Sequence, residues 1–410
     1  MIESGDWAEQ DVLFDYYMRA VPFMRARTEL LFNVSADEAG FWQVETGTAF
    51  GALSAVDYGI CGGQGAPRPK GWPVWLGTNP YVLLDRYGDG PMSEFALMFL
   101  DRWRHDQDDA ALQARLPWAV GAINFFAFAF PNRTADGKVV IFPTQALETW
   151  QCPYPFSEAH CVTDDAPTVA TVTQLLARLL QLPARFSTPA QRAKWGSLLA
   201  AMPALPFDAA SGLLLPAALM TGASRNSEAC ALYSVHPARL LSVAANHTRP
   251  GGCDLDAAAR TFASDPNAGG SAEGNNGWHQ GTMHAPLLGL RNETAALLLG
   301  RVPGSPLAGF RFPFFSGEDG MADFPSVEQY SNLQAGLQLA LIQAGEDNAS
   351  WNTPGAIVLL PGWPCAWDVS FRLRAPFNTV VTVVWANSSL QSLDVQPPAR
   401  RRDVVFAPGC

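Results

Sequence analysis

The sequence predicts a mainly α-helical protein that ends in a small β module, and three observations support this expectation. From about residue 7 to residue 343, apolar residues recur at three- and four-residue spacing, the pattern of amphipathic helices. Long connections rich in Gly and Pro separate these helices, whereas a helix bundle would prefer shorter ones. After Pro354 the pattern changes to short β-branched or alternating segments. We therefore expect an (α/α)6 toroid over residues 1–352 and a C-terminal β-sandwich module over residues 353–410.

The helices follow in order along the first of these parts. A first helix is expected over residues 12–31, and a second amphipathic face is marked by Phe95, Met98, Phe99 and Trp103. The same spacing recurs over residues 110–129, 169–182, 190–202, 255–262, 283–299 and 327–343. The longest connections cover residues 58–90, 142–167, 203–234 and 303–325. Their content of Trp, Tyr, Asp and Glu is too high for disorder, so we expect them to form the binding surface.

The C-terminal module is predicted from four short segments divided by Pro, Asn and Gly. They cover residues 357–360, 367–373, 379–385 and 404–406. A β module of roughly fifty residues is too small to fold confidently alone, so we expect it to pack against the helical body.

Composition excludes several classes of partner. The net charge is −11 and the charges are spread along the chain, so no basic stripe is present that could bind nucleic acid. No apolar run approaches the roughly eighteen residues of a membrane-spanning helix. The 13 Trp residues and the many Asn, Gln and Asp suit a polyhydroxylated ligand better than a phosphate.

Six Asn-x-Ser/Thr sequons and seven cysteines indicate the secretory route. The sequons begin at Asn33, Asn132, Asn246, Asn292, Asn348 and Asn387. The cysteines lack metal-binding spacing, so disulfides fit better than a zinc site, and Cys152 and Cys161 are close enough to staple one loop. The amino terminus has no secretory leader, so we interpret the chain as truncated. The alternative is a cytosolic protein with accidental sequons.

The strongest candidate for acid chemistry is Glu148, which lies between an apolar run and Trp150. Glycoside hydrolysis needs two carboxyl groups, roughly 5 Å apart for retention and about 6.5–9.5 Å apart for inversion. Partial desolvation beside Trp150 would keep the Glu148 carboxyl protonated near neutrality, as a general acid requires. The alternative is a glutamate that only caps or bridges a loop.

Asp319 and Asp323 precede the predicted helix that contains Tyr330, and they are candidates for the second carboxyl group. Capping of that helix is the default interpretation of Asp323, while Asp319 lies further upstream and is less easily explained as a cap. Glu45 and Glu94 each stand where an aromatic loop meets a probable helix and could bind sugar hydroxyls. Stabilisation of a helix dipole explains Glu94 equally well.

Aromatic residues near these carboxylates offer faces for a sugar ring. Trp42 and Trp150 lie beside Glu45 and Glu148, and Trp278 with His279 follows a flexible Gly-Asn-Asn-Gly segment. A single histidine of this kind is more often structural than catalytic. Motifs of serine hydrolases, phosphate-binding loops, dinucleotide folds and zinc proteases are absent from the sequence, and no cofactor or metal is expected.

Several segments resemble the six-hairpin glycosidases, and within them glycoside hydrolase family 95 and its relatives. Residues 142–149 are similar to the family region that carries the general acid, which corresponds to Glu148. Asn226-Ser-Glu-Ala-Cys-Ala-Leu-Tyr-Ser-Val-His-Pro is similar to a leucine-tyrosine-proline motif, and Asn276-Gly-Trp-His to a glycine-tryptophan helix start. Ile357-Val-Leu-Leu-Pro-Gly-Trp-Pro-Cys-Ala-Trp is similar to the entry into the family's β module.

The resemblance implies an inverting exo-glycosidase without a cofactor that acts on an oligo- or polysaccharide, with α-L-fucoside or α-L-galactoside as the implied sugar. The family's asparagine pair has no counterpart before Phe41 and Trp42, so the motif does not assign the base. Asp319 and Asp323 resemble an aspartate pair in the same loop of the family's relatives, which implies Asp319 as the base, with Glu45 as the next candidate. The same departure favours an alternative, a non-catalytic carbohydrate-binding protein on this scaffold. A third hypothesis is a purely structural helical protein.

Overall fold

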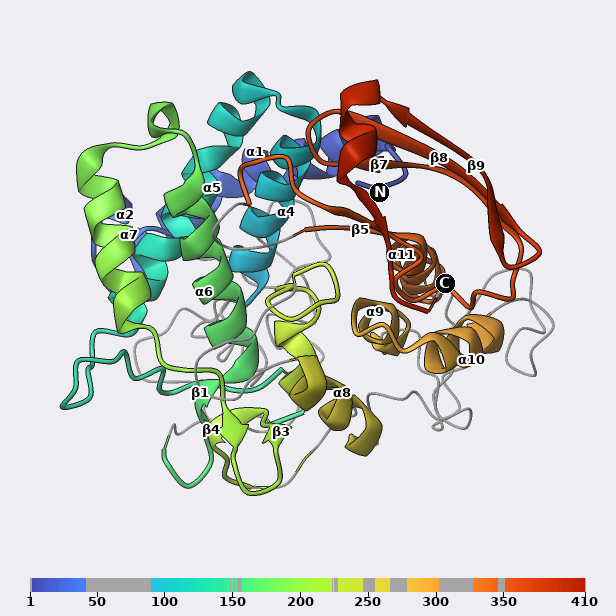
Figure 1. Cartoon of the computed structure of the whole chain (residues 1–410). Helices are drawn as coiled ribbons and strands as arrows, with labels where there is room; N and C mark the ends of the chain where they lie inside the picture. Colours follow the sequence, from blue (N-terminus) through green and yellow to red (C-terminus); the bar gives the residue numbers. More distant parts are fainter. Residues whose placement is uncertain are drawn as a thin grey trace.

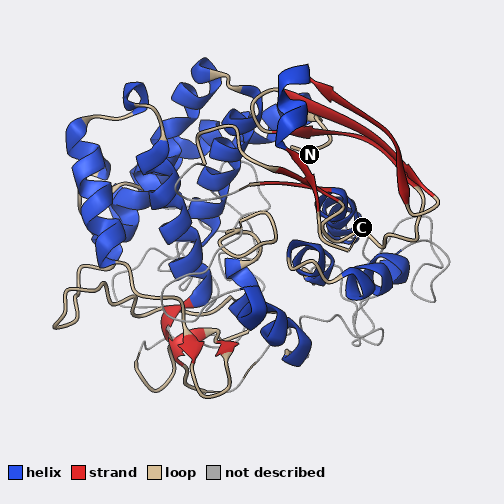
Figure 2. Ribbon diagram, viewed as in Figure 1, coloured by secondary structure: helices blue, strands red, loops and turns tan. Residues whose placement is uncertain are grey.

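Helices dominate the fold, as the sequence predicts (Figures 1 and 2). The computed structural model describes residues 2–41, 90–147, 149–150, 152, 157–222, 224, 228–245, 255–265, 279–301, 327–345 and 351–409. The helices are α1 (Trp7–Phe32), α2 (Ala36–Ala39), α4 (Gly90–Asp106), α5 (Asp109–Ala129), α6 (Ala166–Gln181), α7 (Pro189–Ala201), α8 (Leu255–Ser264), α9 (Gly281–Leu287), α10 (Arg291–Arg301) and α11 (Val327–Leu341). Short 3-10 turns are η3 (Ala184–Phe186), η4 (Cys230–Ser234) and η5 (Pro398–Asp403).

One prediction among the helices is corrected. The face expected over residues 283–299 is divided into α9 and α10. Pro286 lies near the end of α9, and Gly289 follows with a φ of 74°, a left-handed conformation that glycine adopts without strain and that ends a helix. The chain therefore turns between two short helices where the apolar spacing alone suggests one.

Alternate helices run in the same direction. Ser93 of α4 donates to Thr171 of α6 (2.8 Å), and Asp101 of α4 pairs with Arg178 of α6 (2.8 Å). Because both pairs advance together along the two helices, α4 and α6 are parallel. α5 packs on α4 and α7 packs on α6, so each forms a returning partner.

The same arrangement recurs in the second half of the chain. Thr282 of α9 donates to the Asn332 carbonyl of α11 (3.1 Å), and Gln343, just after α11, donates to the Pro286 carbonyl (2.8 Å). α9 and α11 are therefore parallel, and α10 packs on both. Gly336 permits the close approach, because a Cβ there would lie 2.5 Å from the Thr282 carbonyl oxygen.

Strands appear mainly after α11. The helical part contains β1 (Thr163–Asp165) paired antiparallel with β4 (Ala217–Leu219), and β2 (Phe207–Asp208) paired antiparallel with β3 (Leu213–Leu214). One later sheet has the order β10 (Val404–Phe406), β6 (Ile357–Leu359), β5 (Ile342–Ala344), with β10 parallel and β5 antiparallel to β6. The other is an antiparallel meander of β7 (Val369–Ala375), β8 (Thr379–Ala386) and β9 (Ser389–Gln396). β5 thus pairs with β6 across the predicted domain boundary.

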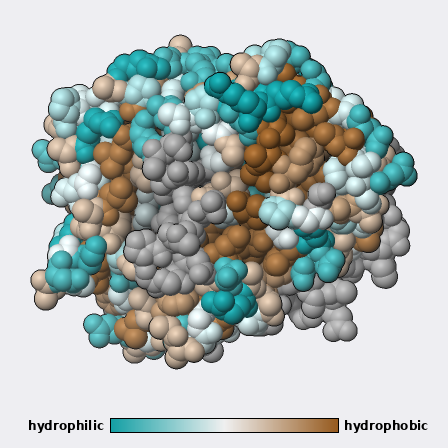
Figure 3. Space-filling model, viewed as in Figure 1, coloured by the Kyte–Doolittle hydropathy of each residue, from teal (hydrophilic) through white to brown (hydrophobic). Residues whose placement is uncertain are grey.

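The C-terminal strands pack on the carboxyl end of α4. The backbone amides of Phe377 and Asn378, in the turn between β7 and β8, donate to the carbonyls of Arg104 (2.8 Å) and His105 (2.7 Å). Arg104 in turn donates to the Trp351 carbonyl (2.8 Å). These bonds satisfy carbonyls at a helix end that would otherwise lack partners. On the face in Figure 3, hydrophobic residues gather on the concave side of β7–β9, beside the hydrophilic η5.

Over the ranges that the structure describes, no helix combines the length and the apolar character that crossing a bilayer requires.

The start of α6 depends on a buried carboxylate. Asp165 is 1% exposed and accepts hydrogen bonds from the Thr168 amide (2.8 Å) and from Thr144 Oγ1 (2.7 Å). Burial raises the pKa of Asp165 to about 6, although both hydrogen bonds act in the opposite direction. Since the folded-state pKa lies above its ordinary value of 3.8, ionisation of Asp165 weakens the fold as the pH rises through this window.

Asp165→Asn tests this assignment, because asparagine keeps the helix cap without the buried charge. Relative to the native chain, the variant should gain up to about 3 kcal/mol in free energy of unfolding between pH 4 and pH 7. Urea denaturation across that range measures the difference. Asp108→Asn, at the exposed cap of α5, is the matched control. Parallel pH profiles for Asp165→Asn and the native chain would contradict the assignment.

Candidate functional site

A cavity of about 330 Å³ lies between α4 and α11, and we call it the central cavity. Four segments that are far apart in the sequence supply its walls: the amino-terminal residues with α1, α4, the segment after η4, and α11. The lining residues are Ile2, Glu3, Gln10, Glu94, Leu97, Met98, Asp101, His236, Pro237, Arg239, Ser331, Gln334, Ala335, Gln338 and Leu339. Amide, hydroxyl and carboxyl groups therefore stand beside apolar side chains, which is the composition of small-ligand sites.

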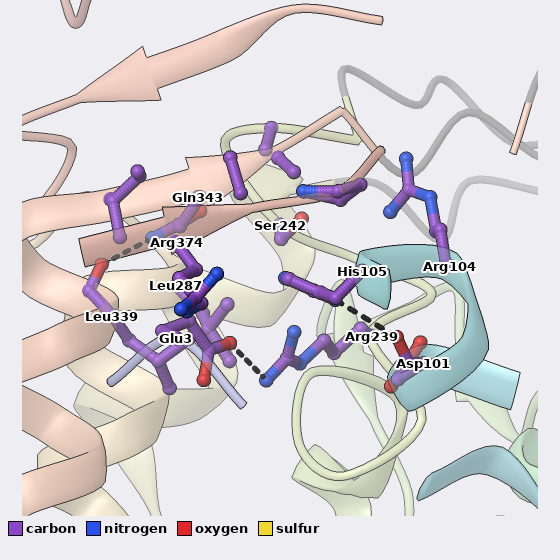
Figure 4. A pocket seen from close by; sticks show the side chains of 15 residues that line it. Glu3, Asp101, Arg104, His105, Arg239, Ser242, Leu287, Leu339, Gln343 and Arg374 are labelled. Atoms are coloured by element: carbon purple, nitrogen blue, oxygen red, sulfur yellow. Dashed lines mark hydrogen bonds and ion pairs between the residues drawn. The ribbon is translucent and has the colours of Figure 1, made fainter. Parts of the chain in front are cut away.

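The floor of the central cavity borders a second, smaller cavity of about 20 Å³, shown in Figure 4. Glu3, Asp101, Arg239 and Leu339 line both. Glu3 and Arg239 form an ion pair (3.3 Å), and His105 Nδ1 lies 2.8 Å from the Asp101 carbonyl oxygen (Figure 4). The smaller cavity has room for about one water molecule.

Buried charges at this floor are compensated by neighbours. Burial alone would raise the pKa of Glu3, but Arg239, followed by His105, lowers it to about 2. Burial lowers the pKa of His105 to about 4, so its ring is neutral at pH 7. Asp101 pairs with Arg178, whose side chain is 1% exposed. The charged side chains at the floor are thus paired, Glu3 with Arg239 and Asp101 with Arg178.

The turn around Glu148 is the second part of the candidate site. Glu148 itself lies outside the described residues, but its neighbours do not. Ala146 and Trp150 exchange two backbone hydrogen bonds (3.2 and 3.1 Å), and a disulfide between Cys152 and Cys161 follows directly. The two ends of the segment, Ala146 and Trp150, are therefore bonded to one another, and the disulfide restrains the chain that follows.

The segment that begins at Glu228 forms hydrogen bonds with this turn. The Cys230 thiol donates to the Ala146 carbonyl (3.1 Å). Burial foremost, and then Glu228, raises the pKa of the Cys230 thiol well above its usual range, so the thiol keeps its proton. Thr149 Oγ1 accepts from the Glu228 amide (3.1 Å) and lies 3.3 Å from the Glu228 carboxylate.

Tyr233 is buried within the electrostatic influence of both Glu94 and Glu228. Burial raises the pKa of this phenol well above its usual range, and the negative charges of Glu94 and Glu228 act in the same direction. Glu94 lines the cavity and Glu228 holds the turn, so both carboxylates lie near one buried phenol. A hydrogen bond with the Gln280 side chain favours the opposite shift.

Three predicted site residues fall within the described part of the chain. Glu94 lines the central cavity, past the first turn of α4, so helix-dipole stabilisation no longer accounts for it. Trp150 is half-buried in an apolar cluster with Ala146 and Cys230. His279 is buried, and its carbonyl accepts from Asn332 (3.4 Å) at the start of α9. The structure does not bring Trp150 or His279 to the lining of the central cavity.

The remaining predicted residues lie outside the described ranges: Trp42, Glu45, Glu148, Trp278, Asp319 and Asp323. Conversely, sequence reasoning missed Gln10 and Arg239 as cavity residues. Glu228, Tyr233 and His236 fall within the segment that resembles a family motif, and that segment was the available signal. Gln10 occupies an ordinary position in an amphipathic helix and gave none.

No protein-family model matches the chain, and a search of curated proteins finds no match. Within the described ranges, no three His, Cys, Asp or Glu side chains are grouped so that they could hold a metal ion.

A double-mutant cycle tests the floor of the cavity. Arg239→Met leaves Glu3 without its cation, and the chain should lose a few kcal/mol of stability, at or below the roughly 3–5 kcal/mol of a fully buried pair. Glu3→Gln with Arg239→Met should recover part of the loss. The contribution of Glu3 should disappear as the pH falls from about 4.5 towards 2, because its folded-state pKa is lowered.

Chemical denaturation of the native chain, of the single variants Glu3→Gln and Arg239→Met, and of the double variant measures the coupling between the two side chains. Arg402→Met serves as control, since Arg402 is 85% exposed beside Asp403 and such pairs contribute about 0–1 kcal/mol. Additive effects of the two floor substitutions would show that Glu3 and Arg239 do not support one another.

Proposed function

We propose that the chain is a glycoside hydrolase of the six-hairpin type, with the central cavity as its sugar pocket and Glu148 as its general acid. The observation that carries the proposal is a cavity lined by carboxyl, amide and hydroxyl groups next to apolar surface. The charges of Glu94, which lines the cavity, and of Glu228, which bonds the turn that contains Glu148, both act on the buried Tyr233. Such a surface suits a polyhydroxylated ring with an apolar face.

The helix directions support a toroid. α4 and α6 are parallel, α9 and α11 are parallel, and α5, α7 and α10 pack outside or between them. α4 and α11 meet across the central cavity. We propose that the parallel helices form the inner ring, so that their amino-terminal ends surround one opening. Glu148 precedes α6, Trp278 precedes α9, and Asp319 precedes α11 in the chain. The proposed inner ring would therefore bring these three residues to the same opening.

The C-terminal strands support a sandwich in the same way. Ile357 and Leu359 of one sheet and Phe371, Val381 and Val383 of the other belong to a single apolar cluster. We propose that the two sheets pack face to face, as β-sandwich layers do.

In the proposed reaction, Glu148 gives its proton to the glycosidic oxygen as the bond between that oxygen and the anomeric carbon breaks. Asp319 takes a proton from a water molecule, whose oxygen forms the new bond on the opposite face of the sugar. The configuration of the anomeric carbon is inverted. Glu45 is the next candidate for the base, and an α-L-fucoside or α-L-galactoside is the first substrate to test.

Secretion is proposed with this function. Four of the sequon asparagines, Asn33, Asn132, Asn292 and Asn387, are exposed, as glycosylation requires. The Cys152–Cys161 disulfide fits an oxidising compartment.

Glu148→Gln is the first experiment. Hydrolysis of an unactivated glycoside, such as a fucosylated or galactosylated oligosaccharide, should fall by about 10²–10⁴, the contribution typical of a general acid. A 4-nitrophenyl glycoside should lose less, because its leaving group needs less protonation. Glu158→Gln, an exposed glutamate on the same connection, is the matched control.

Equal activity of Glu148→Gln and the native chain on the oligosaccharide would remove Glu148 from the acid role. Glycoside binding without hydrolysis by the native chain would favour the non-catalytic carbohydrate-binding protein instead.

Passage through the secretory pathway of a eukaryotic host gives a separate expectation. Peptide N-glycosidase should lower the mass of the secreted protein, and Asn132→Gln should remove one step of that shift. An unchanged mass after enzyme treatment would argue against glycosylation at these sites.

A further inference from the structure

α4 and α11 run past the central cavity in the same direction. Glu94 of α4 and Ser331 of α11 line the central cavity but not the smaller one at its floor. Asp101 and Leu339, about two helical turns further along α4 and α11, line both cavities. At about 1.5 Å per residue, Glu94 and Ser331 each lie about 10–12 Å before the floor residue of their own helix. They therefore mark the same end of the central cavity, which we call its mouth.

Each of the two helices presents a short stripe of accessible side chains near the mouth. Glu94 and Met98 are four residues apart on α4, and both are half-buried. Gln334 and Ala335 lie three and four residues after Ser331 on α11, and Ser331 and Gln334 are exposed. Side chains at such spacings are neighbours on one helix face, with Cβ atoms about 5–6 Å apart. Because these side chains line the cavity and keep accessible surface, a ligand in the cavity can contact them.

The chemistry of the wall changes from the mouth to the floor. The mouth carries the Glu94 carboxylate, the Ser331 hydroxyl and the Gln334 amide. Leu97 and Met98, about one turn deeper along α4, are apolar. A carboxylate only accepts hydrogen bonds, while a hydroxyl and an amide both donate and accept. A ligand hydroxyl can therefore bond with any of the three mouth groups, and the apolar level can cover the C–H face of a ring.

The charges of the wall favour an uncharged ligand. Burial foremost, and then the negative charge of Glu94, raises the pKa of the Tyr233 phenol, so Glu94 acts as an anion at the mouth. Arg239, a cation in the described lining, is paired with Glu3 at the floor (3.3 Å). An acidic ligand would therefore be repelled at the mouth and would have to displace Glu3 to gain a partner. The volume of about 330 Å³ is near the lower end of small-molecule sites and suits one sugar ring with part of a second.

We propose that Glu94, Ser331 and Gln334 are the specificity-determining residues of the central cavity. They bind the hydroxyl groups of one uncharged sugar ring at the mouth, and the apolar face of that ring rests on Leu97 and Met98. The inference rests on the proposed function and extends it by naming the class of sugar and the residues that recognise it. The recognition site needs both helices, because α4 supplies the anion and the apolar level while α11 supplies the hydroxyl and the amide.

Isothermal titration of the Glu148→Gln chain tests this recognition without relying on hydrolysis. The neutral probes are the methyl glycosides of L-fucose, L-galactose and D-galactose. Gln334→Leu and Ser331→Ala, added separately, should each raise the Kd of the best neutral probe by about three- to tenfold, the effect of one hydrogen bond between neutral groups. Both positions are exposed on a helix and both new residues are good helix formers, so the Tm of the ligand-free chain should not fall. Gln113→Leu, at an exposed glutamine of α5, is the matched control.

The charge of Glu94 has a readout of its own. Methyl α-D-galacturonide carries a carboxylate and should bind the Glu148→Gln chain at least about tenfold more weakly than the best neutral probe, because like charges repel. Adding Glu94→Gln keeps an accepting oxygen but removes the charge, so the difference should shrink to about threefold or less. A purely structural role for Glu94 would weaken the acidic and the neutral ligand alike.

Four results would each overturn the recognition site. They are unchanged Kd values in both Gln334→Leu and Ser331→Ala, a galacturonide that binds as tightly as the best neutral probe, a galacturonide that stays at least about tenfold weaker after Glu94→Gln, and no binding by any probe. Failure of the proposed hydrolysis is seen independently. If the native chain binds these glycosides through Gln334 but hydrolyses no linked sugar, the recognition site stands and the enzyme proposal falls.

Discussion

The buried pairing of Asp101 with Arg178 is the interaction on which the rest of the arrangement depends. It fixes α4 parallel to α6, and the Arg178 guanidinium also lies over the Trp351 ring (5.5 Å). Arg104, one turn further along α4, contacts the same ring and donates to the Trp351 carbonyl. Loss of either partner would leave an uncompensated charge in the interior. The Asp101–Arg178 pair therefore links α4, α6, the Trp351 segment that leads to the C-terminal strands, and the floor of the central cavity.

The two parts of the candidate site have different mechanical support. The central cavity is formed by long, well-packed helices, so the positions of Glu94 and Gln10 follow from helix packing. The turn near Glu148 is held by backbone bonds between Ala146 and Trp150, by the Cys230 thiol and by a disulfide. A reacting group must be held within a fraction of an ångström of its target. We propose that the cross-linked turn meets this requirement for Glu148.

Local sequence patterns predicted the elements better than the contacts between them. Apolar spacing located α5 and α11, because burial of one helix face constrains every third or fourth residue. It merged α9 with α10, since Gly289 breaks the helix without breaking the apolar pattern. Glu94 was recognised at a helix start, but Gln10 carries no local signature, and the motif-like segment that contains His236 gives no sign that it faces α1. Gln10 and His236 line one cavity only because α1 and the segment after η4 meet, and nothing in either segment alone specifies that contact.

We propose above all that parallel helices begin around a single sugar-binding cavity next to the turn that contains Glu148. A crystal structure of the Glu148→Gln chain with a bound neutral disaccharide tests it most directly. We expect the sugar ring to lie between Glu94 and Ser331, with its glycosidic oxygen facing the segment between Ala146 and Trp150. A disaccharide bound on another face, or a central cavity that holds only water at saturating ligand, would contradict it.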